Sequence, residues 1–425
     1  MKVMKDVNVH LENKKVSRAF FAYLFIMYSV VYMTKSCFSG ALSAIVAEGS
    51  LTLSQTTSIS AAFYIAYAPL QVLGGIFADK YSPERLIIIG LLGGAAANTV
   101  IFFNQSYYVM LFAWIFNAII QFALWPSVFK IISSQLVRSD RKSMAFLISL
   151  GSSGGLVLSF AVAACIPSHA WKYNFAVSAV SLILSAIVMR LFCARLDPIL
   201  KKDKIPAPEP TEKNNDKTPP TVSTSRLFLM SGFFAVLPAV LLRIMLETGV
   251  KNFSSTMLMQ SYNGISPSVG NLLSVLVVVG GILGVVIAKF VIFPRIIKNE
   301  ITACLVTTAL SIPFAVVLSF IGPKIPVIAI VISMTLINLL LTASTLFIQY
   351  YNMYFTKYGK NGTAAGIINA AAAAGMALQF CIFGPVAERL GWPTVTTIWI
   401  GMIAVTVLCL AIALRPANKF KKENT

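Results

Sequence analysis

Long apolar runs alternate with short polar segments along almost the whole chain, starting near residue 18. Each run holds about 20 residues or more, which lets a helix cross a hydrocarbon layer of roughly 30 Å. Segments buried in lipid must be helical, because only then are their backbone groups hydrogen bonded. The pattern predicts twelve transmembrane helices near residues 18–46, 54–78, 84–104, 107–136, 142–166, 171–193, 227–250, 267–292, 301–321, 325–350, 361–386 and 392–414.

A polar segment divides these spans into two groups of six. Residues 194–225 contain KKDK, PAPEP and TEKNNDKTPP, a proline-rich mixture that has no apolar face to bury. We therefore expect an all-α membrane protein with one six-helix bundle over residues 1–193 and a second over residues 226–425. The segment between them is the predicted linker.

Composition and charge agree with a membrane protein. Hydrophobic residues make up 57% of the 425 residues, charged residues 12%, and the mean hydropathy is +0.80. The formal net charge of +19 does not indicate a nucleic-acid partner, because Lys and Arg lie in the loops between apolar spans. The N-terminus, the linker, the C-terminal tail and every second short loop carry most of them. The positive-inside rule therefore predicts cytoplasmic termini in a bacterial-type inner membrane, and we expect a monomer surrounded by lipid.

The placement of charge repeats between the two halves. Arg18 opens the first span and Lys35 follows 17 residues later, while Arg226 opens the seventh span and Arg243 also follows 17 residues later. At 1.5 Å per residue, both deep cations are expected roughly 25 Å from the cytoplasmic end of their helices. Substrate sites of transporters built from two repeats lie at such depths.

The loop between the second and third spans, Gly74 to Arg85, reads GGIFADKYSPER. It resembles the signature loop of the major facilitator superfamily, in which Gly is followed after three residues by Asp and then by Arg or Lys. Gly75, Asp79 and Lys80 match, and Arg85 lies at the basic end. An Asp at a helix end beside such cations can pair with neighbouring helices and latch one conformation. The alternative is an ordinary positive-inside loop.

The first span contains Tyr32, Lys35, Cys37 and Phe38. An amine in the bilayer centre is costly unless it is paired, hydrated or facing a ligand, so Lys35 is a candidate functional residue. The stretch resembles the Tyr-x-x-Arg-x-Asn-Phe pattern in the first helix of the organophosphate:phosphate antiporter family, with Lys35 where that family has its anion-binding arginine. Lysine offers a point charge where arginine offers a bidentate fork, and Cys37 replaces the asparagine.

The fourth span reads QFALWPSVFKII and contains Gln121, Trp125, Pro126 and Lys130. It is similar to the same family's Trp-Pro-Pro sequence followed by a basic residue at the same spacing, with Lys130 in the basic position. Two interpretations of Lys130 remain open: it lines the substrate cavity, or it extends toward the cytoplasmic interface.

The seventh span places Arg243 and Glu247 four residues apart, on one face of a helix. Its segment from Met245 to Ser255 resembles the family's Arg-x-Gly-Val stretch, but alignment on Gly249 and Val250 puts Glu247 at the cation position. Two interpretations are open here as well. The pair is either an internal ion pair that holds the helix, or Arg243 binds substrate while Glu247 tunes it or takes a proton.

The fifth and eleventh spans are rich in small residues, among them Gly151, Gly154 and Gly155 in one and Gly366 and Gly375 in the other. Small residues let helix backbones approach closely. We interpret these positions as packing sites rather than substrate contacts.

The resemblance implies the major facilitator fold and alternating access, in which two bundles move about a central site. Deep cations outnumber the single deep carboxylate, so we expect a small organic anion, a phosphate ester or a carboxylate, with hydrogen bonds from Tyr28, Tyr32 and Gln121. No phosphate-binding loop, HExxH motif or nucleophile elbow occurs, so we expect neither an enzyme nor a cofactor or metal.

Two other functions remain open. A proton-coupled exporter of hydrophobic or cationic compounds would use Glu247 as its proton carrier. A transporter-like membrane sensor would bind ligand without net flux, as some relatives of the antiporter family do.

Overall fold

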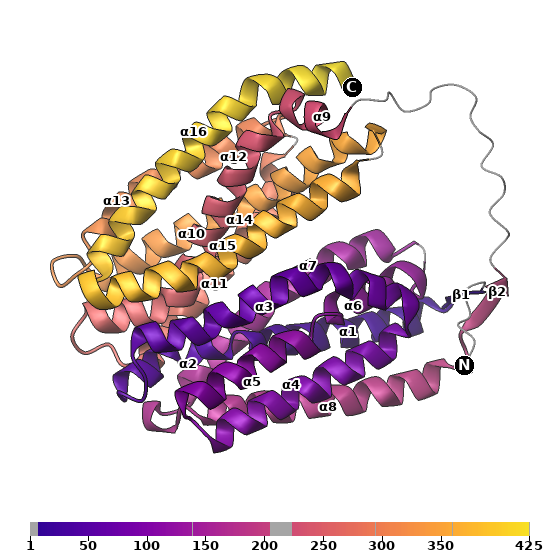
Figure 1. Cartoon of the computed structure of the whole chain (residues 1–425), viewed down its shortest axis with the longest axis horizontal. Coiled ribbons are helices and arrows are strands. Elements are labelled where there is room, and N and C mark those ends of the chain that lie inside the picture. The colour runs from indigo at the N-terminus through magenta and orange to yellow at the C-terminus, as the bar shows by residue number, and fades with distance from the viewer. Residues whose placement is uncertain (1–6, 138, 205–222, 294, 359, 425) are drawn as a thin grey trace. The chain divides into compact units, whose positions relative to one another are not determined.

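The computed structural model describes residues 7–137, 139–204, 223–293, 295–358 and 360–424 (Figure 1). Apart from one short pair of strands, the elements in these ranges are helices, and eleven are long and apolar enough to cross a membrane. The remaining predicted span, 54–78, corresponds to α3 (Leu53–Lys80), a helix whose first turns carry several Ser and Thr residues and are therefore less apolar. The predicted all-α membrane fold is confirmed.

The first six predicted spans are formed by eight α-helices. These are α1 (Lys14–Lys35), α2 (Cys37–Ala47), α3, α4 (Pro83–Phe103), α5 (Tyr107–Ile120), α6 (Leu124–Ser134), α7 (Arg141–Cys165) and α8 (Tyr173–Leu196), with a short 3-10 turn η1 (Ser168–Ala170) before α8.

The last six predicted spans are also formed by eight α-helices. These are α9 (Thr224–Met230), α10 (Phe233–Ser261), α11 (Pro267–Ile287), α12 (Glu300–Ala309), α13 (Ile312–Ser319), α14 (Val327–Met353), α15 (Asn361–Leu390) and α16 (Trp392–Asn424), with short turns η2 (Ala288–Ile292) and η3 (Tyr354–Tyr358). The seventh span extends to Ser261, eleven residues beyond the predicted boundary at 250.

Four predicted spans are interrupted. The first breaks at Ser36 between α1 and α2, the fourth breaks over residues 121–123 between α5 and α6, the seventh breaks at Ser231 and Gly232 between α9 and α10, and the ninth breaks at Leu310 and Ser311 between α12 and α13. At the last break, Pro313 lies in the first turn of α13, where its missing N–H leaves no helical hydrogen bond unmade. Discontinuous helices in transporters frequently form binding sites.

The chain divides into two compact units. The first comprises Met1–Ala41 and Ala62–Asn214, and the second comprises Leu42–Ala61 and Asn215–Thr425. The hairpin formed by the end of α2 and the start of α3 therefore belongs to the second unit, where Ser43 Oγ lies 3.0 Å from Ser255 Oγ of α10.

The helices of each unit pack in similar pairs. In the first unit α1 packs on α7 and α4 packs on α8, while in the second α10 packs on α15, and α12 and α13 pack on α16. A Cβ atom on Gly155 of α7 would lie 2.4 Å from Ser29 O of α1, and one on Gly375 of α15 would lie 2.6 Å from Leu241 O of α10. The small residues expected to allow close packing do so at these two positions.

A glutamate in the first turn of the third span of each unit also repeats. Glu84 of α4 accepts a hydrogen bond from Gln135 Nε2, just beyond α6, and Glu300 of α12 accepts one of 2.9 Å from Tyr354 Oη, just beyond α14. Lys421 of α16 also bonds Glu300, at 3.0 Å. Each glutamate thus connects the start of the third span to the end of the fourth.

Two short strands join the N-terminal segment to the predicted linker. β1 (Val7–His10) pairs antiparallel with β2 (Lys201–Lys204), with Val7 opposite Lys204 and His10 opposite Lys201. Residues 205–222 of the linker lie outside the described residues.

Candidate functional site

Lys35 is the last residue of α1 and lies directly before the break in the first span. The N–H of Ser36 bonds Tyr32 O at 3.0 Å and closes the last turn of α1. Ser159 Oγ of α7 donates to Ser36 O at 2.9 Å, and the N–H of Gly40 in α2 donates to the same carbonyl at 3.0 Å. The break thus has its own hydrogen bonds and places Lys35 at a helix end.

Lys35 is buried, with 8% of its surface exposed. Its Nζ donates to Tyr67 Oη of α3 at 3.2 Å and lies 4.4 Å from the centroid of the Tyr67 ring and 5.4 Å from that of Tyr32. Among the described residues, no carboxylate forms an ion pair with Lys35. Tyrosine hydroxyls and ring faces stabilise an ammonium without neutralising it. The first unit therefore holds a buried, uncompensated positive charge.

Two further aromatic residues continue the aromatic contacts from Tyr32. The ring of Tyr28 lies 5.0 Å from that of Tyr32 and 4.9 Å from that of Trp125 in α6. Gly151 of α7 provides the space for Tyr28, because a Cβ there would lie 3.0 Å from the Tyr28 ring. We refer to Tyr28, Tyr32, Lys35, Tyr67 and Trp125 as the lysine cluster.

Sequence reasoning did not select Tyr67. The available signal was the pair Tyr64 and Tyr67 in the second span, where two hydroxyl groups fall near one helical face. Nothing in the sequence shows that this face meets Lys35.

The second unit holds the predicted Arg243–Glu247 pair on α10. Arg243 Nη1 donates to Glu247 Oε2 at 2.7 Å, and also to Leu341 O at 2.8 Å and Thr345 Oγ1 at 3.0 Å, both on α14. Arg243 is 3% exposed and Glu247 5%. Arg243 thus joins α10 to α14 in addition to pairing with Glu247.

A third charged residue, Lys251, continues this row on the same face of α10. Lys251 Nζ bonds Glu247 Oε1 at 2.7 Å, so each carboxylate oxygen of Glu247 has a cationic partner. We refer to Arg243, Glu247 and Lys251 as the charge row, which has a net charge of +1. The sequence analysis did not select Lys251, although its spacing of four residues from Glu247 places both on one face of a helix.

Lys130 lies in neither group of residues. Its Nζ donates to Ala78 O at 2.5 Å, in the last turn of α3. A cation beside the last carbonyl groups of a helix stabilises that helix end. The structure therefore gives Lys130 a partner beside the loop that carries the predicted latch.

Gln121 lies at the break of the fourth span and is fully buried. Its Nε2 donates to Asn117 Oδ1 at 2.7 Å, and a Cβ on Gly94 of α4 would lie 2.3 Å from that Nε2. These contacts place Gln121 between α4 and α5.

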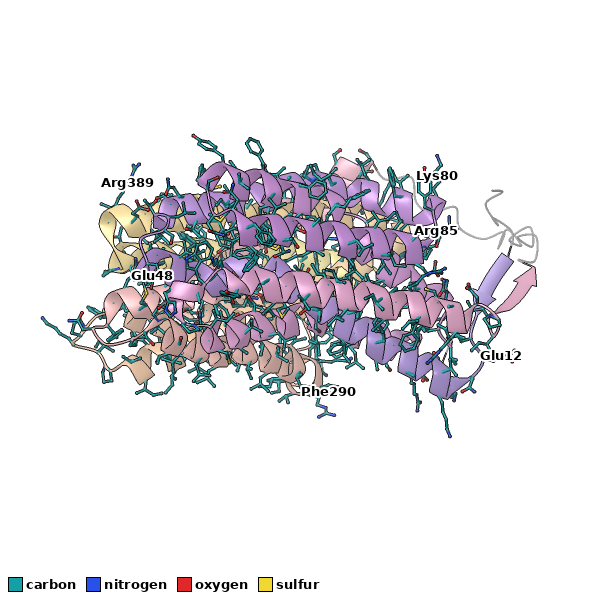
Figure 2. The ribbon with its side chains drawn as sticks, turned by 90° about the horizontal axis from the view of Figure 1, so that it is seen from below. Glu12, Glu48, Lys80, Arg85, Phe290 and Arg389 are labelled. Atoms are coloured by element: carbon teal, nitrogen blue, oxygen red, sulfur yellow. The ribbon has the colours of Figure 1, made fainter. Side chains whose placement is uncertain are left out.

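The predicted latch residues lie at one end of the first unit, where Figure 2 labels Lys80 and Arg85. The backbone N–H of Arg85 donates to Ser82 Oγ at 3.4 Å, which caps α4, and Lys80 is exposed. A Cβ on Gly75 would meet no atom within 4 Å. The side chain of Asp79 lies outside the described residues.

An ion pair with defined geometry follows α6. Arg18 Nε bonds Asp140 Oδ2 at 3.0 Å, and the hydroxyl of Ser139 together with Arg18 lowers the pKa of Asp140. Both interactions favour the charged carboxylate, so the pair is present at neutral pH.

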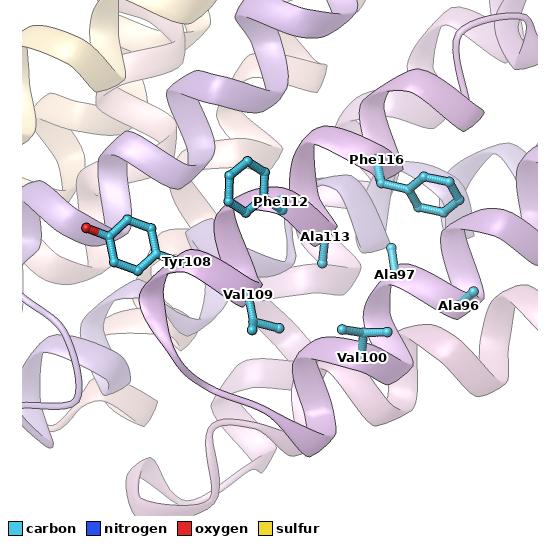
Figure 3. A pocket seen from close by; sticks show the side chains of 8 residues that line it. All are labelled: Ala96, Ala97, Val100, Tyr108, Val109, Phe112, Ala113 and Phe116. Atoms are coloured by element: carbon cyan, nitrogen blue, oxygen red, sulfur yellow. The ribbon is translucent and has the colours of Figure 1, made fainter.

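A pocket of about 380 Å³ lies between α4 and α5 (Figure 3). Its lining is almost entirely apolar and has no charged side chain: Ala96, Ala97, Val100, Tyr108, Val109, Phe112, Ala113 and Phe116. The exposed apolar side chains on these spanning helices suit contact with lipid rather than an anion.

Comparison with known proteins identifies the family to which the sequence is similar. The sequence pattern of the Major Facilitator Superfamily matches residues 24–379, which is most of the chain.

Curated relatives match over shorter segments. The chain is 25% identical over 170 residues to the membrane sensor protein UhpC of Salmonella typhimurium, covering 40% of this chain and 38% of that protein. It is 25% identical over 152 residues to a probable hexose phosphate transport protein of Chlamydia pneumoniae, covering 35% and 33%. The chain thus spans less than two thirds of these relatives' own lengths.

Two solved structures share the fold over nearly the full chain. A bacterial homolog of the human lysosomal transporter Spinster, in an inward-facing and occupied conformation, matches with a TM-score of 0.70 at 14% identity, covering 97% of this chain and 99% of that one. The nucleoside transporter NupG matches with a TM-score of 0.65 at 16% identity, covering 92% and 100%.

Proposed function

Because the chain belongs to the major facilitator superfamily, we propose that it is a secondary transporter that carries a small organic anion, a phosphate ester or a carboxylate, by alternating access. The observation that carries this proposal is Lys35, a buried cation at a helix break with no carboxylate partner among the described residues. A buried charge of this kind is stable when a ligand of opposite sign binds it.

The charge row supports the same substrate class. Arg243, Glu247 and Lys251 together leave one positive charge on α10, so each unit holds a net positive group of buried residues. A cationic substrate would be repelled by both groups, which argues against an exporter of cations. Similarity to a probable hexose phosphate transport protein also favours a phosphate ester.

Substitution of Lys35 tests the proposal directly. We expect Lys35→Ala to reduce uptake of glucose 6-phosphate and of inorganic phosphate into proteoliposomes at least tenfold, because the uncompensated charge is removed. Lys35→Arg is the control, since it keeps the charge and adds hydrogen-bond donors. Unchanged uptake in Lys35→Ala would contradict the proposal.

A membrane sensor is the second candidate, favoured by the similarity to UhpC. Purified protein that binds glucose 6-phosphate but shows no flux or exchange in proteoliposomes would support the sensor and exclude the transporter.

The chain is an integral, multi-pass membrane protein. As part of the proposal, it lies in a bacterial-type inner membrane as a monomer, with both termini cytoplasmic and no nucleic-acid partner. The N-terminal segment with Glu12 lies at the same end of the first unit as Lys80 and Arg85 (Figure 2), which agrees with the positive-inside rule.

A further inference from the structure

The two cations of the charge row differ in how they are held. Arg243 Nη1 has three acceptors, two of them on α14, and 2% of the Arg243 side chain is exposed. The Nζ of Lys251 bonds Glu247 alone among the described residues, and 13% of the Lys251 side chain is exposed. An ammonium carries three N–H donors, so two of those on Lys251 are not used by a described residue.

The bonds of Arg243 make it a poor ligand for a substrate that must bind and leave. If Arg243 turned toward a substrate, its hydrogen bonds to Leu341 O and Thr345 Oγ1, which join α10 to α14, would break. If Lys251 turned toward a substrate, Glu247 would keep Arg243, and no buried carboxylate would be left without a cation.

We infer that Lys251 is the anion-binding cation of the second unit, and that the carboxylate of Glu247 occupies Lys251 until a substrate anion displaces it. The inference rests on the proposed function and names the residue that binds the substrate's phosphate or carboxylate group. Glu247 then acts as an internal competitor, because its carboxylate presents to Lys251 the same kind of oxygen ligand as the substrate does.

This arrangement also accounts for a carboxylate among residues that bind anions. With Lys251 on Glu247, the Lys251 ammonium has a carboxylate partner in the empty protein, which lowers the cost of burying it. With an anion on Lys251, the Arg243–Glu247 pair remains neutral.

Binding of inorganic phosphate and of glucose 6-phosphate to the purified full chain in nanodiscs, measured by calorimetry, tests the inference. We expect Lys251→Ala to weaken binding at least tenfold and Lys251→Arg to stay within about threefold of the wild type, because it keeps the charge. Glu247→Gln should strengthen binding at least threefold, because it removes the competitor.

The combination Lys251→Ala with Glu247→Gln separates the loss of Lys251 from a change in net charge. It keeps the charge of the row at +1, as in the wild type, through Arg243, and it should bind as weakly as Lys251→Ala. Wild-type affinity in Lys251→Ala or in the combination, or weaker binding in Glu247→Gln, overturns the inference.

The outcomes also separate this inference from the proposed function. If Lys35→Ala abolishes anion binding but Lys251→Ala leaves it unchanged, the role of Lys251 is wrong and the proposed anion transport still holds. Absence of any binding or uptake by the wild-type protein overturns both.

Discussion

Arg243 shows how one side chain can combine a charge with a structural role. Its guanidinium pairs with Glu247 on its own helix and bonds the backbone of α14 through Leu341 O. The sequence left two interpretations of the Arg243–Glu247 pair, and its contacts with α14 are those of a group that holds helices together. The lysine cluster differs, because Lys35 bonds a phenol and faces two rings.

Replacement of Arg243 is expected to destabilise the second unit. Arg243→Ala breaks a buried ion pair and should lower the free energy of unfolding by about 3 kcal/mol, the lower end of the usual range, because Lys251 still neutralises Glu247. Thr345→Val is the matched control, since it removes one hydrogen bond and should cost about 1 kcal/mol. Unfolding in detergent, followed by circular dichroism, measures both, and equal stability of Arg243→Ala and wild type would contradict the structural role.

At the scale of elements, close helix pairs position the candidate residues. The contact of Gly155 with the backbone of α1 brings α7 against the turn that contains Tyr32, one turn before Lys35. The break at Ser36 then ends α1 at Lys35, so the position of the ammonium depends on this helix pair as well as on the break.

Adding one methyl group to α7 tests this dependence. Gly155→Ala would place a Cβ 2.4 Å from both Ser29 O and Tyr32 Cβ, so α1 and α7 must separate, and we expect a loss of about 1–3 kcal/mol of stability together with reduced anion uptake. Gly154→Ala is the neighbouring control, because its nearest atom would be Ser29 Oγ at 3.6 Å, an ordinary contact. Equal thermal stability and uptake for the two variants would refute the packing argument.

At the scale of the whole molecule, the two units share the arrangement of their helices more closely than they share sequence motifs. Glu84 and Glu300 each lie in the first turn of a third span and bond a side chain beyond the fourth span. The first spans differ, because the first unit has a break after Lys35 while α10 continues unbroken through Arg243 to Ser261. The repeat therefore preserves packing and allows the candidate binding residues to differ.

The orientation of the whole chain follows from its loop charges and is open to a direct test. A fluorescent protein fused to the C-terminus is expected to fluoresce, because it remains in the cytoplasm with the basic tail. Alkaline phosphatase fused after Gln105, in a loop without basic residues, should be active, whereas the same enzyme fused after Asp140 should be inactive. An inactive enzyme fused after Gln105 together with an active enzyme fused after Asp140 would contradict the proposed topology.

The apolar runs were sufficient to predict the helical membrane fold, because the length and polarity of a segment alone decide whether it crosses a bilayer. The same local reasoning selected Lys35, Arg243 and Glu247, since charges inside such segments are visible without a structure. It did not reveal the helix breaks at residues 36 and 121–123, and at the first of these Ser159 Oγ of another helix, α7, donates to Ser36 O.

Partners across helices were decided by the tertiary structure alone. The sequence does not show that Lys35 meets Tyr67, that Lys130 bonds Ala78 O, or that Arg243 is held by α14 while Lys251 is not. These contacts join residues between 32 and 98 positions apart, and helix rotation and packing determine them. The sequence by itself determined which charges enter the membrane, and only the packing of the helices decided which of them remain available to a ligand.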